Sequence, residues 1–158
     1  PGVRLIPAAR IVLTDGFQVT CLPRDRAAWG RLCRLLSLGR LRAEKGHCRL
    51  DLADLLTWGE GLEMLVLPAD QRLTLAMIGE GMEPKLWQAH VRQLARRFPG
   101  QVGLVLAPRY DGQDPQRFQD LARLAKGFGL PTIASGLPFL HHGRRRRLAD
   151  VLTAIRLG

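Results

Sequence analysis

The chain has 158 residues, 46% of them hydrophobic and 24% charged, which is an ordinary composition for a globular protein with its own core. The sequence contains no 18-residue apolar run and no signal-peptide pattern, and its three cysteines form no C-x-x-C pair. These features argue against a membrane span, a secreted disulfide framework and a structural zinc site, so we expect one soluble domain in a reducing cytoplasm.

The charge balance is strongly basic. Lysine and arginine total 24 against 14 aspartate and glutamate residues, which gives a formal net charge of +10. Such a surplus favours an anionic partner, most often nucleic acid, because each neutralised phosphate releases counterions. It is equally compatible with arginine-rich solvated helix faces whose charge is balanced elsewhere in a longer protein. The opening at Pro1, which runs directly into an apolar stretch, leads us to expect an internal segment of such a protein.

The first predicted elements are a β-hairpin and a helix. Apolar strands are predicted within residues 3–13 and over 17–22, on either side of Thr14-Asp15-Gly16, a sequence typical of a tight turn. Asp25 stands at the N-cap position of a helix that should end near residues 39–42. The apolar residues of this helix recur at helical spacing: Ala28, Leu32, Leu35 and Leu36.

From residue 51 onward the pattern alternates helices and strands. Residues 51–56 predict a short capped helix, and the apolar run 62–67 predicts a buried strand. The later elements are a helix over 84–98, a strand over 102–107, a helix from Asp114 to Gly127, a strand over 131–134 and a helix over 145–155. The order of strands and helices between residues 62 and 135 is typical of parallel βαβ units in a sheet or barrel.

Few residues point to catalysis. The four histidines, His47, His90, His141 and His142, form no triad, H-E-x-x-H or other catalytic pattern with the carboxylates, so we assign no catalytic residue. His90 is interpreted as a partly exposed helix residue. His141 and His142 follow the end of a predicted strand, where α/β proteins place their sites, so they are candidates for a metal or phosphate role. A solvated loop is the alternative for this pair.

A basic run near the end of the chain is the candidate for nucleic-acid binding: Arg144, Arg145, Arg146 and Arg147. Guanidinium groups match phosphate geometry, and four arginines that open a helix oppose the helix dipole unless an anion lies nearby. Acidic residues elsewhere in a longer protein are the alternative partner. Trp29, Trp58 and Trp87 are interpreted as core or interface anchors and not as base-stacking platforms.

Three stretches together carry a family resemblance. Residues 25–40 read DRAAWGRLCRLLSLGR, residues 43–50 read AEKGHCRL, and residues 145–156 read RRRLADVLTAIR. The first resembles the N-Y-x-x-L-C-R-L-L-T-x-G helix of the PHP (polymerase and histidinol phosphatase) domain of bacterial C-family DNA polymerase III alpha subunits. The last resembles R-R-x-L-x-D-V-L-x-x-I-R of the error-prone branch. The layout of residues 102–134 is similar as well, and the resemblance is thin only over 68–84.

The resemblance implies an α/β fold that is part of a PHP-type distorted (β/α) barrel, with mostly parallel strands alternating with helices. Residues 1–158 would form a single, partial PHP domain whose first strands lie upstream of Pro1. In the error-prone branch the last helix leads out of the PHP domain. Residues 145–158 would therefore be an exit helix towards the polymerase core.

The metal site of the family is expected to be lost. Where metal-binding members carry a glutamate after Gly-Cys, this chain has Arg10, and where they carry Asp-x-His it has Leu137 and Phe139. Leucine and phenylalanine cannot bind a hard or borderline cation, and arginine repels one. His141 and His142 are residual candidates, but two histidines without carboxylates or thiolates make a weak site.

The sequence is therefore interpreted as a segment of an error-prone DNA-directed DNA polymerase, which acts in damage-tolerant synthesis. The segment itself is expected to be a non-catalytic scaffold that binds no cofactor, with the polymerase carboxylates and their magnesium in the rest of the parent chain. Expected partners are the downstream polymerase domains, DNA, the sliding clamp and other damage-tolerance proteins. A metal-dependent PHP-type phosphoesterase and a basic nucleic-acid-binding module are the alternatives.

Overall fold

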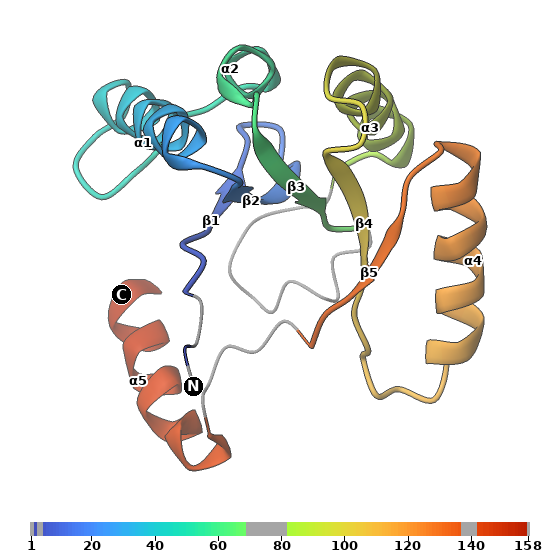
Figure 1. The fold of residues 1–158 in the computed structure, drawn as a ribbon. Coiled ribbons are helices and arrows are strands. Elements are labelled where there is room, and N and C mark those ends of the chain that lie inside the picture. Colours follow the sequence, from blue (N-terminus) through green and yellow to red (C-terminus); the bar gives the residue numbers. More distant parts are fainter. Residues whose placement is uncertain (1, 3–4, 69–81, 137–141, 158) are drawn as a thin grey trace.

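The computed structural model describes residues 2, 5–68, 82–136 and 142–157, and its α/β fold is built on one five-stranded sheet (Figure 1). The strands lie in the sheet in chain order: β1 (Ala9–Val12), β2 (Gln18–Pro23), β3 (Leu62–Val66), β4 (Val102–Leu106) and β5 (Thr132–Ala134). The helices are α1 (Arg26–Leu41), α2 (Leu52–Trp58), α3 (Pro84–Arg97), α4 (Asp114–Gly127), the short 3-10 helix η2 (Gly143–Arg145) and α5 (Arg146–Leu157). None of the helices in the described ranges is long and apolar enough to cross a membrane.

β1 and β2 form the predicted hairpin. They pair antiparallel, with Val12 opposite Gln18, and Gly16 in the turn has a φ of 86°. This left-handed conformation explains the glycine, which adopts it at little steric cost. The first strand is shorter than predicted, because residues 5–6 are exposed and lie outside β1, while residues 3–4 lie outside the described part of the chain.

α1 and α2 begin at the capping residues that the sequence predicts. The side chain of Asp25 accepts a 2.7 Å hydrogen bond from the backbone N–H of Ala28 at the start of α1. At the start of α2, the carboxylate of Asp54 accepts a 3.0 Å hydrogen bond from the backbone N–H of Asp51. The same carboxylate lies 2.8 Å from Nη1 of Arg42, so an ion pair connects the two helices.

β3, α3, β4, α4 and β5 form the predicted strand-helix series. β3 and β4 pair in parallel, with Met64 opposite Val102, and β4 and β5 pair in parallel, with Leu104 opposite Thr132. The carboxyl ends of these three strands therefore meet at one edge of the sheet. This is the edge at which α/β proteins commonly bind ligands.

The sheet differs from the predicted barrel in two respects. The pairs β1–β2 and β2–β3 are antiparallel, so the sheet is mixed and not mostly parallel. Over the described residues, β1 and β5 are edge strands, and the sheet is not closed into a barrel. The antiparallel β1–β2 pair has a simple cause, because a tight turn can join only antiparallel neighbours. A continuous βα alternation therefore does not describe the beginning of this chain.

The core lies between the sheet and the helices that cover it in Figure 1. Strand alternation places Val19 and Cys21 of β2 on the same side as Met64 and Val66 of β3, and all four side chains are fully buried. Burial raises the pKa of the Cys21 thiol to about 12. The largest fully buried side chains include Phe17, Phe98, Leu32, Leu35, Leu50, Leu55, Leu62, Leu94 and Leu104.

α5 lies apart from this core (Figure 1). Within the described residues its main contacts are with η2, the short helix that precedes it. Its apolar side chains occur at positions i, i+3, i+4 and i+7 and therefore form one stripe. They are half to three-quarters exposed: Leu148 50%, Val151 56%, Leu152 58% and Ile155 74%. An exposed stripe of this kind is typical of a surface that packs against a partner.

Candidate functional site

Arg10, which was predicted to replace a metal ligand, lies in β1. Its Nη2 donates a hydrogen bond to Oε1 of Gln18 on β2. Partial burial lowers the pKa of the guanidinium from its ordinary value. A guanidinium beside an amide does not provide the anionic or imidazole donors that a divalent cation requires.

Most of the remaining positions of the predicted metal site lie outside the part of the chain that the structure describes. Leu137, Phe139 and His141 lie outside the described residues. His142 is described, and its Nδ1 accepts a 3.1 Å hydrogen bond from the backbone N–H of Arg144, which caps η2. Among the described residues, no three His, Cys, Asp or Glu side chains form a group that could hold a metal ion.

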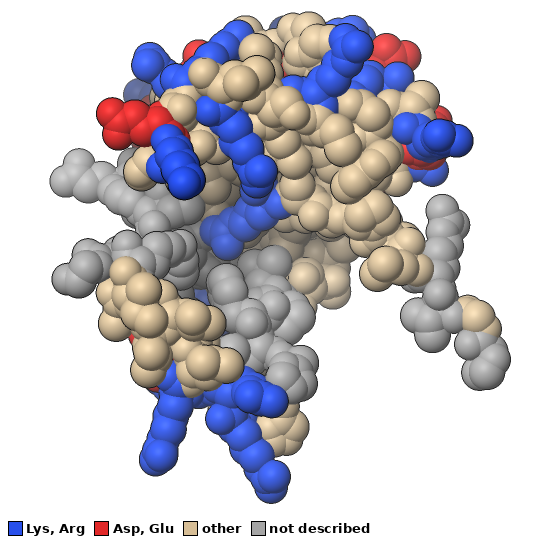
Figure 2. Space-filling model, turned by 90° about the vertical axis from the view of Figure 1, so that its left-hand side faces the viewer, with Lys and Arg blue, Asp and Glu red and all other residues tan. Residues whose placement is uncertain are grey.

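The basic run is exposed at the tip of the molecule. Arg144 and Arg145 belong to η2, Arg146 and Arg147 open α5, and none of the four forms an ion pair with a described residue. Figure 2 shows basic side chains that project from this lower end, next to the uncharged surface of α5. Because positive charge at a helix N-terminus opposes the helix dipole, an anion bound here would stabilise the segment.

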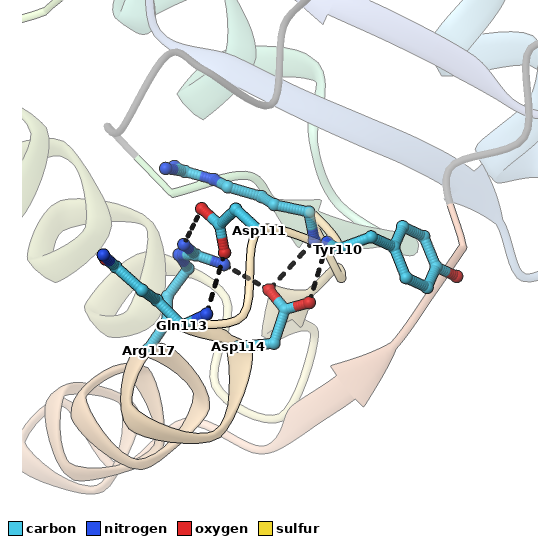
Figure 3. A network of polar contacts seen from close by, with 6 residues as sticks. Tyr110, Asp111, Gln113, Asp114 and Arg117 are labelled. Atoms are coloured by element: carbon cyan, nitrogen blue, oxygen red, sulfur yellow. Dashed lines mark hydrogen bonds and ion pairs between the residues drawn. The ribbon is translucent and has the colours of Figure 1, made fainter.

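A polar network that the sequence did not indicate holds the loop after β4 (Figure 3). The carboxylate of Asp114 accepts 2.9 Å hydrogen bonds from the backbone N–H groups of Arg109 and Tyr110. Arg117 forms ion pairs with Asp114 and with Asp111, the second at 2.5 Å. The i, i+3 spacing of Asp114 and Arg117 is visible in the sequence, but the contact with Asp111 depends on the path of the loop.

This network is structural in character. The pKa of the Asp111 carboxyl is lowered, first by a hydrogen bond from the backbone N–H of Gln113 and then by Arg117. Both carboxylates are engaged by donors, so neither is placed as a general acid or base. Tyr110 has a φ of 59°, and its side chain is 87% exposed and points away from the network in Figure 3.

A cavity of about 590 Å³ lies beside the same loop. Its lining comes from the segment after β3, the loop after β4 and one face of α4: Pro68, Arg109, Gly112, Gln113, Gln116, Arg117, Asp120, Leu121 and Leu124. The position at the carboxyl ends of parallel strands suits a ligand site. However, the described lining residues include no histidine or cysteine, and the guanidinium of Arg117 is already paired.

His90 is buried, so its interpretation as a partly exposed residue was wrong. Its side chain is 8% exposed, and Nε2 lies 2.6 Å from Oδ2 of Asp15 in the β1–β2 turn. The ring packs against Phe17, with 5.2 Å between the ring centroids. One sequence signal could have predicted the burial, since His90 follows Trp87 by three residues and precedes Leu94 by four on the apolar face.

The three tryptophans have different environments. Trp87 is a core anchor as predicted, buried and donating a 2.9 Å hydrogen bond from Nε1 to the carbonyl of Leu67. Trp58 is half-buried, and the guanidinium of Arg34 lies 5.6 Å from its ring centroid. Trp29 is 44% exposed on the outer surface of α1. The interpretation of Trp29 and Trp58 as interface anchors stays a prediction, and Trp58 has an arginine beside its ring.

Comparison with known proteins relates the chain to one kind of polymerase. No protein-family model matches the chain. It is 47% identical over 154 residues to the error-prone DNA polymerase of Ruegeria pomeroyi and 42% identical over 151 residues to that of Sinorhizobium medicae. It is also 41% identical over 157 residues to error-prone DNA polymerase 1 of Rhizobium meliloti.

These matches cover 97%, 95% and 98% of this chain but only 13% of each relative. The chain is therefore homologous to a segment of error-prone DNA polymerases, as the sequence predicted. The matches identify the kind of protein and not the domain to which the segment corresponds.

Proposed function

We propose that the chain is the PHP-type segment of an error-prone DNA polymerase and that it acts there as a scaffold without a metal centre of its own. The homology to error-prone DNA polymerases over nearly the whole chain carries the proposal. The resemblance of residues 25–40 and 145–156 to PHP-domain motifs supports the assignment to this domain. DNA synthesis and its magnesium would then belong to the rest of the parent chain.

The environment of the candidate ligands supports a scaffold. Arg10 contacts an amide, and His142 caps a helix. The carboxylates of Asp111 and Asp114, at the ligand-binding edge of the sheet, are engaged by backbone N–H groups and by Arg117. Each of these groups stabilises local structure, which supports the scaffold over a metal-dependent hydrolase.

The apolar stripe of α5 is the proposed contact with the polymerase core. The matched segment is a small part of each relative, so most of the parent chain is available to cover the stripe. Burying the exposed parts of Leu148, Val151, Leu152 and Ile155 would contribute about 1–2 kcal/mol for each side chain. Contacts of this size are sufficient to fix a domain beside its neighbour.

A chimera tests the assignment and the contact together. The matching segment of the Ruegeria pomeroyi polymerase is replaced by this chain, and primer extension and solubility are measured. We expect extension close to that of the unmodified enzyme. Val151→Asp should lower both primer extension and solubility, because it places a charge in the apolar stripe. Ala154→Asp adds the same charge outside the stripe and should have little effect on either quantity. Equal effects of the two substitutions would contradict the proposed contact.

DNA is the proposed partner of Arg144–Arg147. Replacing the four arginines with alanine should weaken DNA binding and reduce the slope of log K against log salt by about 0.9 for each lost duplex phosphate contact. Fluorescence anisotropy with a labelled duplex measures both quantities. If the slope is unchanged, acidic residues of the parent chain become the better partner for the run.

Metal analysis separates the scaffold from the phosphoesterase alternative. The purified chain is incubated with zinc, manganese or magnesium, analysed for bound metal and assayed for phosphoester hydrolysis. We expect neither stoichiometric metal nor hydrolysis. Bound metal with hydrolysis would refute the scaffold and establish a phosphoesterase. A chain that binds DNA but does not support extension in the chimera would favour the independent nucleic-acid-binding module.

A further inference from the structure

The outer surface of α1 presents a basic ridge with an exposed aromatic ring. Arg26, Trp29, Cys33, Ser37 and Arg40 are separated by three, four, four and three residues, so they lie on one face of the helix. The opposite face, with Ala28, Leu32, Leu35 and Gly39, is buried against the core. From Arg26 to Arg40 the ridge is about 21 Å long at 1.5 Å per residue. We name this surface the α1 ridge.

Charge on the α1 ridge is not balanced locally. No aspartate or glutamate occurs between Asp25 and Glu44, and the carboxylate of Asp25 is used as the N-cap of α1. Arg26 and Arg40 are exposed, and neither forms an ion pair with any residue that the structure describes. By contrast, Arg42 is paired with Asp54. Within the described part of the chain, the charges of Arg26 and Arg40 are therefore not neutralised.

The aromatic ring gives the ridge a second property. Trp29 is 44% exposed and lies one turn from Arg26, so an exposed aromatic side chain and a cation share this face of the helix. On the flank, the guanidinium of Arg34 lies 5.6 Å from the ring centroid of Trp58 in α2, which holds another arginine on this surface. Gly30, next to Trp29, has nothing within 4 Å of the position that a Cβ would occupy. The helix surface at Gly30 is thus open.

We infer that the α1 ridge is a binding surface for single-stranded DNA. Exposed aromatic rings beside arginines are the components of single-strand sites, in which bases stack on the rings and phosphates contact the cations. A single strand fits better than a duplex, because only an unpaired base offers its face to Trp29. The inference goes beyond the proposed scaffold and does not depend on it, since it rests on the surface of α1 alone.

The test uses the 158-residue chain with Arg144–Arg147 replaced by alanine, so that the tip of α5 does not contribute to binding. Anisotropy of a labelled 20-residue oligo-dT is measured at several salt concentrations. Trp29→Ala should weaken binding about 5- to 150-fold, the effect of one lost stacking contact, and Trp29→Phe should retain most of the affinity. Circular dichroism and thermal unfolding establish that each variant is folded.

Charge is tested in the same assay. The double variant Arg26→Gln/Arg40→Gln should lower the salt slope by about 1.4, since each single-strand phosphate contact contributes about 0.7. Arg96→Gln/Arg123→Gln removes the same charge from α3 and α4 and should leave the slope unchanged.

Four results would overturn the inference. The first is that the chain with Arg144–Arg147 replaced by alanine does not bind oligo-dT, and the second is that Trp29→Ala leaves its affinity for oligo-dT unchanged. The third is that the chain binds a duplex of the same length as tightly as oligo-dT, and the fourth is that poly-glutamate displaces oligo-dT as effectively as unlabelled oligo-dT does. The last result would assign the ridge to an acidic protein. All of these measurements are independent of polymerase activity. They therefore still test the inference if the chimeric polymerase does not extend primers.

Discussion

Replacing His90 with alanine should release α3 from the β1–β2 turn. The side chain is buried, its Nε2 lies 2.6 Å from Oδ2 of Asp15, and its ring packs against Phe17. The other ring nitrogen, Nδ1, is buried and has no hydrogen-bond partner among the residues that the structure describes. The contact with Asp15 is therefore the polar interaction that keeps the imidazole in the core, and it joins residues that are 75 positions apart.

The expected cost follows from these contacts. A hydrogen bond to a charged group contributes about 1.5–3 kcal/mol, and removal of the ring also eliminates its packing against Phe17. We therefore expect His90→Ala to lower the free energy of unfolding by about 3 kcal/mol. For a chain of this length, such a loss lowers the melting temperature by about 6–12 °C.

Urea unfolding followed by circular dichroism measures the effect, and a double-mutant cycle assigns it. Asp15→Asn is the second substitution, because it keeps an oxygen for the hydrogen bond from Phe17 while it removes the carboxylate. The coupling free energy between the two sites should be about 1–2 kcal/mol. Gln93→Ala, on the exposed side of α3, should change stability by less than about 0.5 kcal/mol. A coupling below about 0.3 kcal/mol would refute the proposed role of the contact.

Two further predictions concern the buried thiol and the loop after β4. Because burial raises the pKa of Cys21 to about 12 from its ordinary value of 9.0, only the unfolded chain ionises this thiol between those pH values. The contribution of this thiol to the free energy of unfolding should be constant below pH 9 and should then fall by about 1.4 kcal/mol per pH unit up to pH 12. Urea unfolding at each pH measures this decrease, which should be absent from Cys21→Ala. Asp114→Ala removes two backbone hydrogen bonds and the pair with Arg117, so it should cost about 1–2 kcal/mol and speed chymotrypsin cleavage after Tyr110. Asp120→Ala, which removes an exposed pair with Arg123, should leave the cleavage rate unchanged.

Local sequence signals predicted most of the secondary structure. Asp25 and Asp51 precede helices, Asp15-Gly16 occupies a turn, and Pro84 lies in the first turn of α3, each for a reason that depends on adjacent residues. The strand-helix series after residue 62 could also be predicted, because a parallel pair needs a long crossover connection, which is usually a helix. The motifs also identified the kind of parent protein that the matches show.

Contacts between segments that are distant in the sequence could not be predicted from local signals. The direction of β2 relative to β3 depends on how the chain returns through α1 and α2, and nothing in the two strands specifies it. The pair of Asp15 with His90 and the contact of Asp111 with Arg117 depend on the assembled fold. The exposure of Trp29 was missed for a related reason, since the apolar face of α1 is complete without it.

The distribution of charge and apolar surface gives the two ends of this molecule different properties. On α5, an apolar stripe follows directly after four arginines, and a nucleic acid offers no apolar groove for Val151 or Ile155. Desolvation of such a stripe favours a protein surface, with the arginines at its edge. On α1 the apolar residues opposite the ridge are buried, and Trp29 is exposed between Arg26 and Arg40 on the ridge itself. The first surface is therefore better suited to packing within a larger polymerase, and the second to a strand of DNA that passes along its outside.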